Sequence, residues 1–325
     1  MTSESIPPFS SLPIDKSGPP YNAWGLYGSE NEKGRLNLIT AENIKRGKDT
    51  ITEGITINLN LPLDFLPVHA SRLPLEHNIK CSGHSNDDIL NFNTQGSTQW
   101  DGFRHYPYQN WPEEGKFTFY GGMDISEASN KEIKKYGVQN YSDKPITSIA
   151  HLIDIPLYLS KNNLPSIDSF SNSNPISLKI IKSCIKEFKI NIKSGDILLI
   201  KTGFIESILS KSNLERNELK NRKKQGNQSC GIESSEEIWK WHWEKGISAV
   251  ASDCPSYEAW PAPSNILSCH EIFLAGWGLP IGELFDLREL SKQCKKFNKW
   301  TFFFTSMGLN VPGGIATPPN AQAIL

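Results

Sequence analysis

Several features that would point directly to a function are missing from this chain of 325 residues. No apolar run reaches the roughly 18 residues that a membrane-spanning helix needs. Positive charge is not in excess, as it usually is in a nucleic-acid binder, because 34 Lys and Arg stand against 35 Asp and Glu. Residues 1–16 also lack the apolar core of a signal peptide. We therefore expect a cytoplasmic protein that binds neither nucleic acids nor membranes.

Cysteine is sparse and scattered along the chain. The six cysteines form no Cys-x-x-Cys pair, which argues against a zinc knuckle or a redox dithiol, and we expect them to be reduced. Neither Gly-x-Gly-x-x-Gly nor Gly-x-x-x-x-Gly-Lys-Ser occurs, so nucleotide binding through the usual phosphate-binding loops has no support. The function must therefore be sought in other residue patterns.

Hydrophobic periodicity predicts strands and helices that alternate after a loop-rich N-terminal arm, residues 1–35. The expected strands are residues 55–61, 195–201, 249–252 and 300–304. The expected helices are residues 40–54, 174–188, 234–243 and 285–297, and one that begins after residue 264 and carries His270. Residues 206–230 form a polar insertion, which we interpret as a solvated helix or a mobile loop, with a partner-binding patch as the alternative.

The most polar and aromatic segment, residues 93–105, places an acid and an imidazole four positions apart. Asp101 can bind a cation or hold a base in position. His105 titrates near neutrality and can take a proton from water. Taken alone, such a pair is more often structural than functional.

Two later segments add further candidates. His270 and Glu283 are plausible nitrogen and oxygen ligands for a divalent metal, although a lone histidine on a partly apolar helix is more often a core residue. His270-Glu271 begins like His-Glu-x-x-His, but Leu274 breaks that zinc-protease motif. Asp253 follows an apolar strand, where it could equally cap a turn.

These segments, in this order, resemble the metal-dependent cyclase/hydrolase superfamily, which includes bacterial kynurenine formamidase and isatin hydrolase. The resemblance is greatest to its longer branch of cyclase-like proteins from fungi and bacteria, and it covers nearly the whole chain. The matching stretches are residues 23–25, 34–40, 87–88, 93–105, 195–203, 251–261, 270–287 and 305–320.

The resemblance implies roles for individual residues. Hydrolytic members carry His-x-Gly-Thr-His-x-Asp-x-x-x-His, in which the first two histidines and the aspartate bind metal and the last histidine acts as base. On this alignment Asp101 is a metal ligand and His105 is the base, whereas Gln95 and Gln99 occupy the positions of the two ligand histidines. His270 and Glu283 best match the later ligand pair.

The two glutamines make a two-zinc site doubtful, because a side-chain amide is a poor zinc ligand. We expect one divalent metal ion (Zn, Mn or Mg) held by Asp101, His270 and Glu283. The implied reaction is hydrolysis of a cyclic amide, lactone or similar carbonyl compound, or the reverse cyclisation, with water activated by the metal. The side chains expected to contact the small-molecule substrate are Gln95, Gln99, Trp100, Arg104, Asp253 and Trp260.

Two alternatives stay open at this point. A metal-free isomerase, dehydratase or cyclase would use His105 and Asp253 as its acid–base pair. A non-catalytic small-molecule binder would keep only the fold. Trp100, Phe103 and Trp260 could line an apolar pocket or belong to the core.

The resemblance also implies an architecture. Members have an α/β fold of the swivelling β/β/α type, in which helices flank a mixed sheet. We expect a single cyclase-like domain over residues 1–325, because segments between residues 93 and 283 must converge on one cleft. A homodimer or homotetramer is expected.

Overall fold

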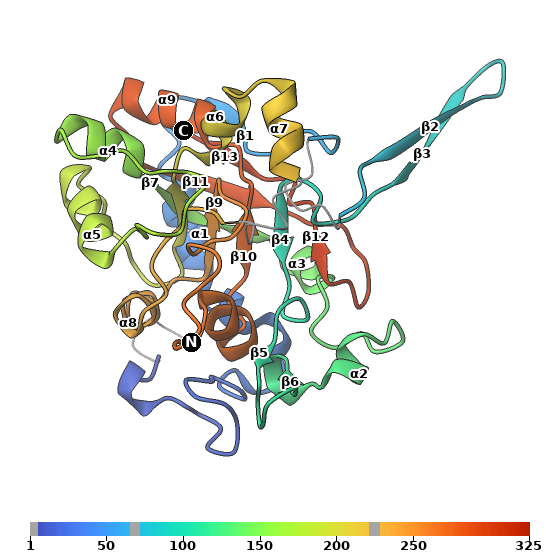
Figure 1. Ribbon diagram of the computed structural model, residues 1–325, viewed down its shortest axis with the longest axis vertical. Helices are drawn as coiled ribbons and strands as arrows, with labels where there is room; N and C mark the ends of the chain where they lie inside the picture. The colour runs from blue at the N-terminus through green and yellow to red at the C-terminus, as the bar shows by residue number, and fades with distance from the viewer. Residues whose placement is uncertain (1–5, 66–71, 221–227) are drawn as a thin grey trace.

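The computed structural model describes residues 6–65, 72–220 and 228–325, which are organised around one nine-stranded mixed sheet (Figure 1). In spatial order the strands are β1 (Thr56–Asn58), β13 (Gln322–Ile324), β11 (Thr301–Ser306), β7 (Ile146–Asp154), β8 (Ile197–Lys201), β9 (Ala249–Ser252), β10 (Ile281–Glu283), β4 (Gln99–Asp101) and β12 (Ala316–Thr317). Strands β7 to β10 run parallel, and all other pairs are antiparallel. The mixed sheet flanked by helices confirms the expected fold class.

The parallel centre of the sheet forms because its strands are apolar on both faces. Every residue of β8 and β9 is buried, as the continuous apolar runs at these positions predict. The α-helices of the described residues are α1 (Ala41–Lys48), α2 (Ile125–Ala128), α3 (Asn140–Asp143), α4 (Ile155–Lys161), α5 (Leu178–Glu187), α6 (Phe204–Leu209), α7 (Asn213–Lys220), α8 (Glu236–Glu244) and α9 (Arg288–Phe297). None of these described helices is long and apolar enough to cross a bilayer.

Helix boundaries follow local capping where tertiary contacts allow it. Thr40 and Asn43 form a reciprocal capping box at the start of α1, and Ser235 caps α8. The helix expected from residue 174 begins only at Leu178, because Ile176 is held in a bridge with Ile232. The buried residues of this helix are Leu178, Ile181 and Cys184.

The other expected elements are present with shifted limits. The helix expected over residues 40–54 ends at Lys48, and the strand expected over residues 55–61 is reduced to β1. His270 directly precedes a π-helical segment, Glu271–Trp277. Within the expected polar insertion at residues 206–230, α6 and α7 extend to Lys220, while residues 221–227 lie outside the described part of the chain.

The described part of the loop-rich N-terminal segment packs on the π-helical segment. Ala23 N–H donates to the carbonyl of Gly276 at 2.9 Å, and Trp24 Nε1–H donates to the carbonyl of Ala275 at 2.7 Å. Gly34 has φ of 50°, and a Cβ there would stand 2.1 Å from the carbonyl oxygen of Gly278. Only glycine permits this approach, which holds the segment that follows His270 in place.

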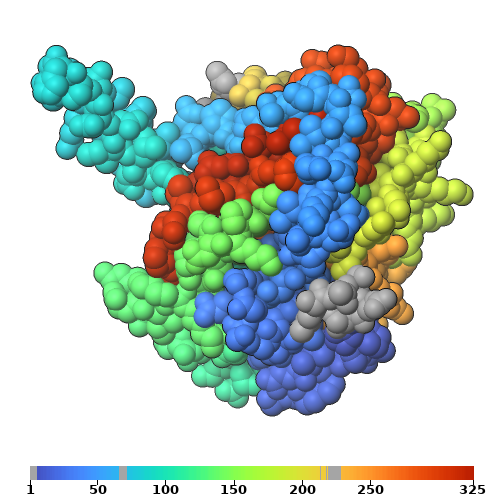
Figure 2. All heavy atoms as spheres, turned by 180° about the vertical axis from the view of Figure 1, so that it is seen from behind, coloured from blue at the N-terminus to red at the C-terminus, as the bar shows by residue number. Residues whose placement is uncertain are grey.

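Two short hairpins lie outside the main sheet. One joins β5 (Tyr108–Gln109) to β6 (Phe117–Thr118). The other joins β2 (Glu76–Cys81) to β3 (Asn86–Asn91) and projects away from the body of the molecule, as both views show (Figures 1 and 2).

Candidate functional site

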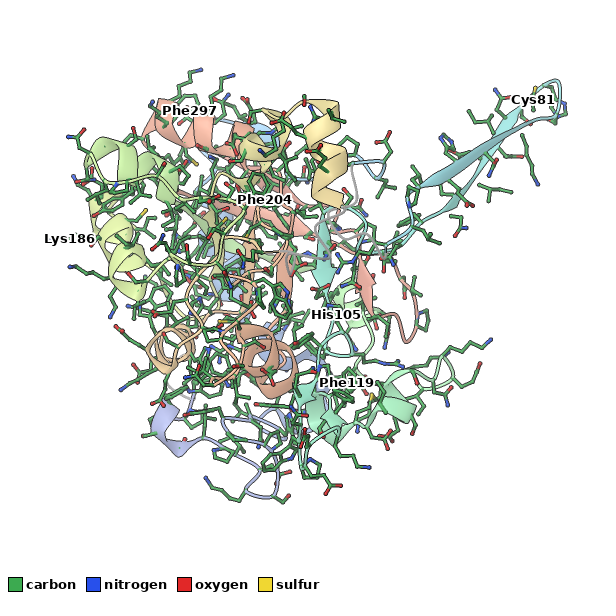
Figure 3. The ribbon with its side chains drawn as sticks, viewed as in Figure 1. Cys81, His105, Phe119, Lys186, Phe204 and Phe297 are labelled. Carbon is green, nitrogen blue, oxygen red and sulfur yellow. The ribbon has the colours of Figure 1, made fainter. Side chains whose placement is uncertain are left out.

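Three of the predicted site residues meet at one point. Asp101, His105 and His270 each offer a ligand atom, and these three atoms lie within 4.8 Å of one another. Asp101 Oδ2 is 3.7 Å from His105 Nε2 and 3.9 Å from His270 Nε2. Asp101 and His270 are buried, whereas His105 retains some exposure at the middle of the molecule (Figure 3).

Strand pairing brings these distant segments together. Strands β4 and β10 are antiparallel, with Asp101 opposite Ile281 and Gln99 opposite Glu283. The Gln99 amide Nε2 donates to Glu283 Oε2 at 2.5 Å. Because alternate residues of a strand share a face, Gln99 and Asp101 point to the same side.

His270 is held between two carboxylates. Its Nδ1 lies 2.8 Å from Glu258 Oε2, its Nε2 lies 3.1 Å from Glu283 Oε1, and its backbone N–H donates to Glu258 Oε1 at 3.0 Å. Burial opposes the charged ring, but Glu258 and then Glu283 raise the pKa of His270 well above its usual value. Burial acts to raise the pKa of Glu258, but the charge and hydrogen bonds of His270 outweigh burial. The pKa of Glu258 is therefore lower than its usual value.

Sequence reasoning assigned no role to Glu258, although it lies five residues after Asp253 in a segment already singled out. The available signal was chemical, because a histidine that binds metal through one ring nitrogen usually donates its other ring N–H to a carboxylate or carbonyl. Nothing in the sequence alone indicated which acid would serve His270.

His105 shares its surroundings with a glutamine and an arginine. Gln95 Nε2 donates to Asp101 Oδ1 at 2.6 Å and lies 3.1 Å from His105 Nε2. Arg72, which the sequence did not single out, donates to the backbone carbonyl of Gln95 at 2.6 Å. Burial lowers the pKa of His105, although Asp101 opposes the shift, so the ring is neutral at physiological pH.

The residues present fit a divalent cation. Asp101 Oδ2 is buried and lacks a hydrogen-bond partner among the described residues, which is costly for a carboxylate oxygen unless a cation or donor completes it. Burial and the neighbouring Asp101 raise the pKa of Glu283 to about 7. A cation would relieve this crowding of negative charge. The three groups whose ligand atoms converge are Asp101, His105 and His270. They include His105 and not Glu283, which was the expected third ligand.

An aromatic pair borders the cluster. The ring centroids of Tyr106 and Trp260 are 5.9 Å apart, and they lie 5.4 and 6.0 Å from that of His270. Trp260 is half-buried beside the site. Trp100, in contrast, is fully buried, with its ring centroid 5.1 Å from that of Phe285, because it points to the opposite face of β4 from Asp101.

Besides Trp100, two further predicted substrate contacts lie away from the cluster. The Arg104 guanidinium donates to backbone carbonyls, including those of Ala128 at 2.7 Å and Ile133 at 2.6 Å. Asp253 Oδ1 accepts from the backbone N–H and hydroxyl of Thr202, at 2.6 and 2.8 Å. Among the described residues, no hydrogen bond or ion pair joins Asp253 to His105.

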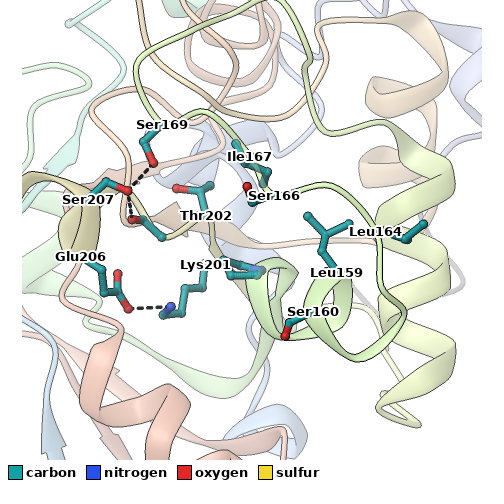
Figure 4. A pocket seen from close by; sticks show the side chains of 12 residues that line it. Leu159, Ser160, Leu164, Ser166, Ile167, Ser169, Lys201, Thr202, Glu206 and Ser207 are labelled. Carbon is teal, nitrogen blue, oxygen red and sulfur yellow. Dashed lines mark hydrogen bonds and ion pairs between the residues drawn. The ribbon is translucent and has the colours of Figure 1, made fainter. Parts of the chain in front are cut away.

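Asp253 instead accepts hydrogen bonds from Thr202 and Gly203, two residues that line a separate cavity of about 590 Å³ (Figure 4). In this cavity Lys201 Nζ contacts Glu206 Oε1 at 2.7 Å, and the hydroxyls of Ser169 and Ser207 are 2.7 Å apart. The sequence therefore grouped two different places in the fold into one expected site.

Comparison with known proteins identifies the family. Residues 44–259 match the family model "Cyclase", described as "Putative cyclase". The chain belongs to the cyclase family. The matched region of this cyclase contains Asp101, His105 and Glu258, and it ends before His270 and Glu283. No curated protein matches the sequence.

Solved structures of other cyclase-like proteins share the fold. A crystal structure described as a novel cyclase is 26% identical, with a TM-score of 0.80 over 94% of this chain and 100% of that chain. Isatin hydrolase A from Labrenzia aggregata, bound to benzyl benzoate, is 13% identical, with a TM-score of 0.57 over 83% of this cyclase and 93% of its own chain. Isatin hydrolase A from Ralstonia solanacearum is 14% identical, with a TM-score of 0.55 and coverages of 87% and 94%. At these identities the two isatin hydrolases show the fold alone.

Proposed function

We propose that this cyclase is a metal-dependent hydrolase that opens a cyclic amide, a lactone or a similar carbonyl compound. The observation that carries the proposal is the buried Asp101 Oδ2, which has no hydrogen-bond partner among the described residues and lies 3.7 and 3.9 Å from the Nε2 atoms of His105 and His270. A divalent cation (Zn, Mn or Mg) bound there would polarise the substrate carbonyl and lower the pKa of the attacking water.

In the first assignment, Asp101, His270 and Glu283 hold the cation. Glu258 orients His270 by accepting its Nδ1–H, so that Nε2 faces Asp101 and Glu283. His105 then accepts a proton from water, since its lowered pKa keeps the ring uncharged before reaction. The nearby Asp101 carboxylate stabilises the imidazolium that forms.

The expected substrate contacts are side chains that lie next to the three converging groups. Gln95 is half-buried and its amide lies beside His105, so we expect it to contact the substrate carbonyl. Gln99 donates its amide to Glu283 and can release it toward an oxyanion. Tyr106 and Trp260 border the site with aromatic surface that suits a flat or apolar substrate.

The convergence of Asp101, His105 and His270 favours a second assignment of roles. Here His105 is the third ligand, and Glu283, with its pKa raised to about 7, accepts the proton. The two assignments predict opposite behaviour for two variants. His105→Ala would weaken metal binding only if His105 is a ligand, and Glu283→Gln would do so only if Glu283 is one.

The decisive experiment combines elemental analysis with activity. Purified protein should contain about one equivalent of a divalent metal, and Asp101→Ala should contain little. Hydrolysis of a panel of cyclic amides and lactones should stop on chelation and return when metal is restored. Full activity in metal-free Asp101→Ala would overturn the proposal in favour of a metal-free isomerase or dehydratase, and saturable ligand binding without turnover would favour a binder.

A further inference from the structure

One arginine of the N-terminal segment is completely buried. Arg35 lies in the 3-10 helical segment Gly28–Leu38, and its exposed fraction is 0%. Its backbone N–H donates to the carbonyl of Gly278 at 2.8 Å, and its side chain reaches the last turn of α8. Charged side chains are rarely buried to this extent unless an opposite charge accompanies them.

Among the described residues, the guanidinium group of Arg35 has only neutral partners. Its Nε–H donates to the carbonyl of Ile247 at 2.6 Å, and its Nη2–H donates to that of Trp243 at 3.3 Å. Its Cζ lies 4.7 Å from the ring centroid of Trp243 and 5.6 Å from that of Trp277, so two aromatic faces attract the charge. Burial lowers the pKa of Arg35 to about 10, so the group is still charged at neutral pH.

Two neighbouring donors at this place lack an acceptor. Arg35 Nη1 and the Tyr27 hydroxyl are both buried, and neither has a hydrogen-bond partner among the described residues. Burial raises the pKa of Tyr27, and the positive charge of Arg35 acts against that rise, as it does when two groups lie close together. Because buried polar atoms are nearly always paired, one acceptor between these two donors would satisfy both.

An anionic acceptor explains more than a neutral one. A water molecule would accept both hydrogen bonds, but it would leave the buried guanidinium without a counter-charge, which is unfavourable in an apolar environment. The rings of Trp243 and Trp277 are fully buried, and their indole N–H groups already donate to the carbonyls of Pro7 and Tyr21. Such closely packed surroundings suit a monatomic anion better than sulfate or phosphate. We propose that a chloride ion binds between Arg35 Nη1 and the Tyr27 hydroxyl.

The proposed ion would join three parts of the fold. Arg35 belongs to the N-terminal segment, Trp243 lies in the last turn of α8, and Trp277 ends the π-helical segment that follows His270. A ligand that binds only the native protein stabilises it by mass action. Chloride should therefore stabilise the packing of these three segments. This inference does not rest on the proposed function, and metal-free protein serves to test it.

Thermal unfolding of the full chain tests the proposal in solution. Chloride is exchanged for gluconate at constant ionic strength, so that general screening by salt does not change. The melting temperature of the wild type should rise by a few degrees between about 1 and 100 mM chloride. A melting temperature that does not respond to chloride would overturn the proposal.

Variants locate the response. Arg35→Met keeps the aliphatic stem without the charge and should abolish the dependence on chloride. Tyr27→Phe keeps the ring and should weaken chloride binding by about tenfold, since one hydrogen bond to the ion is lost. Arg46→Met is the matched control, because Arg46 already has a carboxylate partner, Asp196, so this variant should keep the full response. An undiminished response in both Arg35→Met and Tyr27→Phe would place the ion elsewhere and overturn the assignment.

Bromide locates the ion directly. Crystals grown in sodium bromide should show an anomalous peak within hydrogen-bond distance of both Arg35 Nη1 and the Tyr27 hydroxyl, and Tyr27→Phe should reduce its occupancy. An ordered peak without anomalous signal would mean that water pairs the two donors, which would overturn the proposal. A bromide peak without any chloride response in solution would mark an adventitious ion only, and it would overturn the proposal as well.

Discussion

The parallel centre of the sheet and its antiparallel edge carry opposite kinds of side chain. In β8 and β9 the buried side chains are almost all aliphatic, and their burial contributes directly to stability. At the edge, β4 is only three residues long and buries Gln99 and Asp101, while β10 buries Glu283. Buried carboxylates lower stability unless they are paired. The comparison indicates that the centre stabilises the fold, whereas the edge buries polar groups, among which Asp101 Oδ2 has no hydrogen-bond partner in the described part of the chain.

Replacing Asp101 should give the largest effect on metal affinity. It should also distinguish the antiparallel edge of the sheet most clearly from the parallel centre. Asp101→Asn should reduce metal affinity by more than the roughly 10–100-fold typical of losing a supporting contact, since the ligand itself is removed. The melting temperature of the metal-free protein should stay the same or rise, because one charge is removed from a crowded buried cluster. Isothermal titration and calorimetry measure the two quantities, and a large fall in metal-free stability would contradict the comparison.

A truncation in the centre should behave in the opposite way. Leu199 is fully buried in β8, and Leu199→Ala should lower the free energy of unfolding by about 2–5 kcal/mol through lost burial and a residual cavity. The metal affinity of the folded fraction should not change. Urea denaturation with a parallel metal titration checks both statements, and a matching loss of metal affinity would show that the two regions are coupled.

Acid should destabilise the scaffold through His242 in α8. Burial lowers the pKa of His242 to about 4, and the positive charge of Arg35 adds to the shift, although the hydrogen bond between Nδ1 and the Ile238 carbonyl opposes it. Between pH 6.5 and 4 the unfolded chain binds a proton that the native ring does not, so stability falls as pH falls. The expected loss is on the order of 3 kcal/mol at pH 4.

The pH profile of a variant isolates this contribution from that of other groups. His242→Gln should lose less stability than the wild type between pH 6.5 and 4, whatever its stability at neutral pH. Urea denaturation at several pH values measures the two slopes. Parallel slopes would mean that His242 does not titrate as its burial implies.

The smallest effect on metal affinity is expected for Glu258, which holds the ring of His270 in place. Glu258→Gln should reduce metal affinity by about 10–100-fold, because the amide holds the His270 ring less firmly. Glu271→Gln is the matched control, since Glu271 is also buried but its carboxylate accepts from Ser268 and Gln109 and not from His270. Equal losses of metal affinity in the two variants would mean that Glu258 has no specific role in metal binding.

Sequence periodicity predicted the centre of the fold better than its edge. The strands β8 and β9 and the Ser235 cap of α8 follow from local rules, namely apolar runs and a capping side chain. The mixed sheet as a whole came from the family resemblance. The start of α5 was predicted too early, because the contact of Ile176 with Ile232 is made across the fold and leaves no local trace.

The candidate site was predictable only where residues lie close together in the sequence. Asp101 and His105 stand out within one short segment. Glu258 and Arg72 reach the site through contacts with residues distant in the sequence, which residue spacing does not predict. Trp100 was predicted to touch substrate as one of the aromatic side chains that could line an apolar pocket. The two-residue period of β4 sends its side chain to the opposite face, and recognising that strand would have placed Trp100 in the core.

Strand β4 has both of its neighbours late in the chain, β10 at residues 281–283 and β12 at residues 316–317. During synthesis, Asp101 leaves the ribosome well before either neighbour has been made. Until then the aspartate has no partner strand, and His270 does not yet exist. The candidate site of a nascent or prematurely terminated chain is therefore incomplete until β10 and β12 have been made.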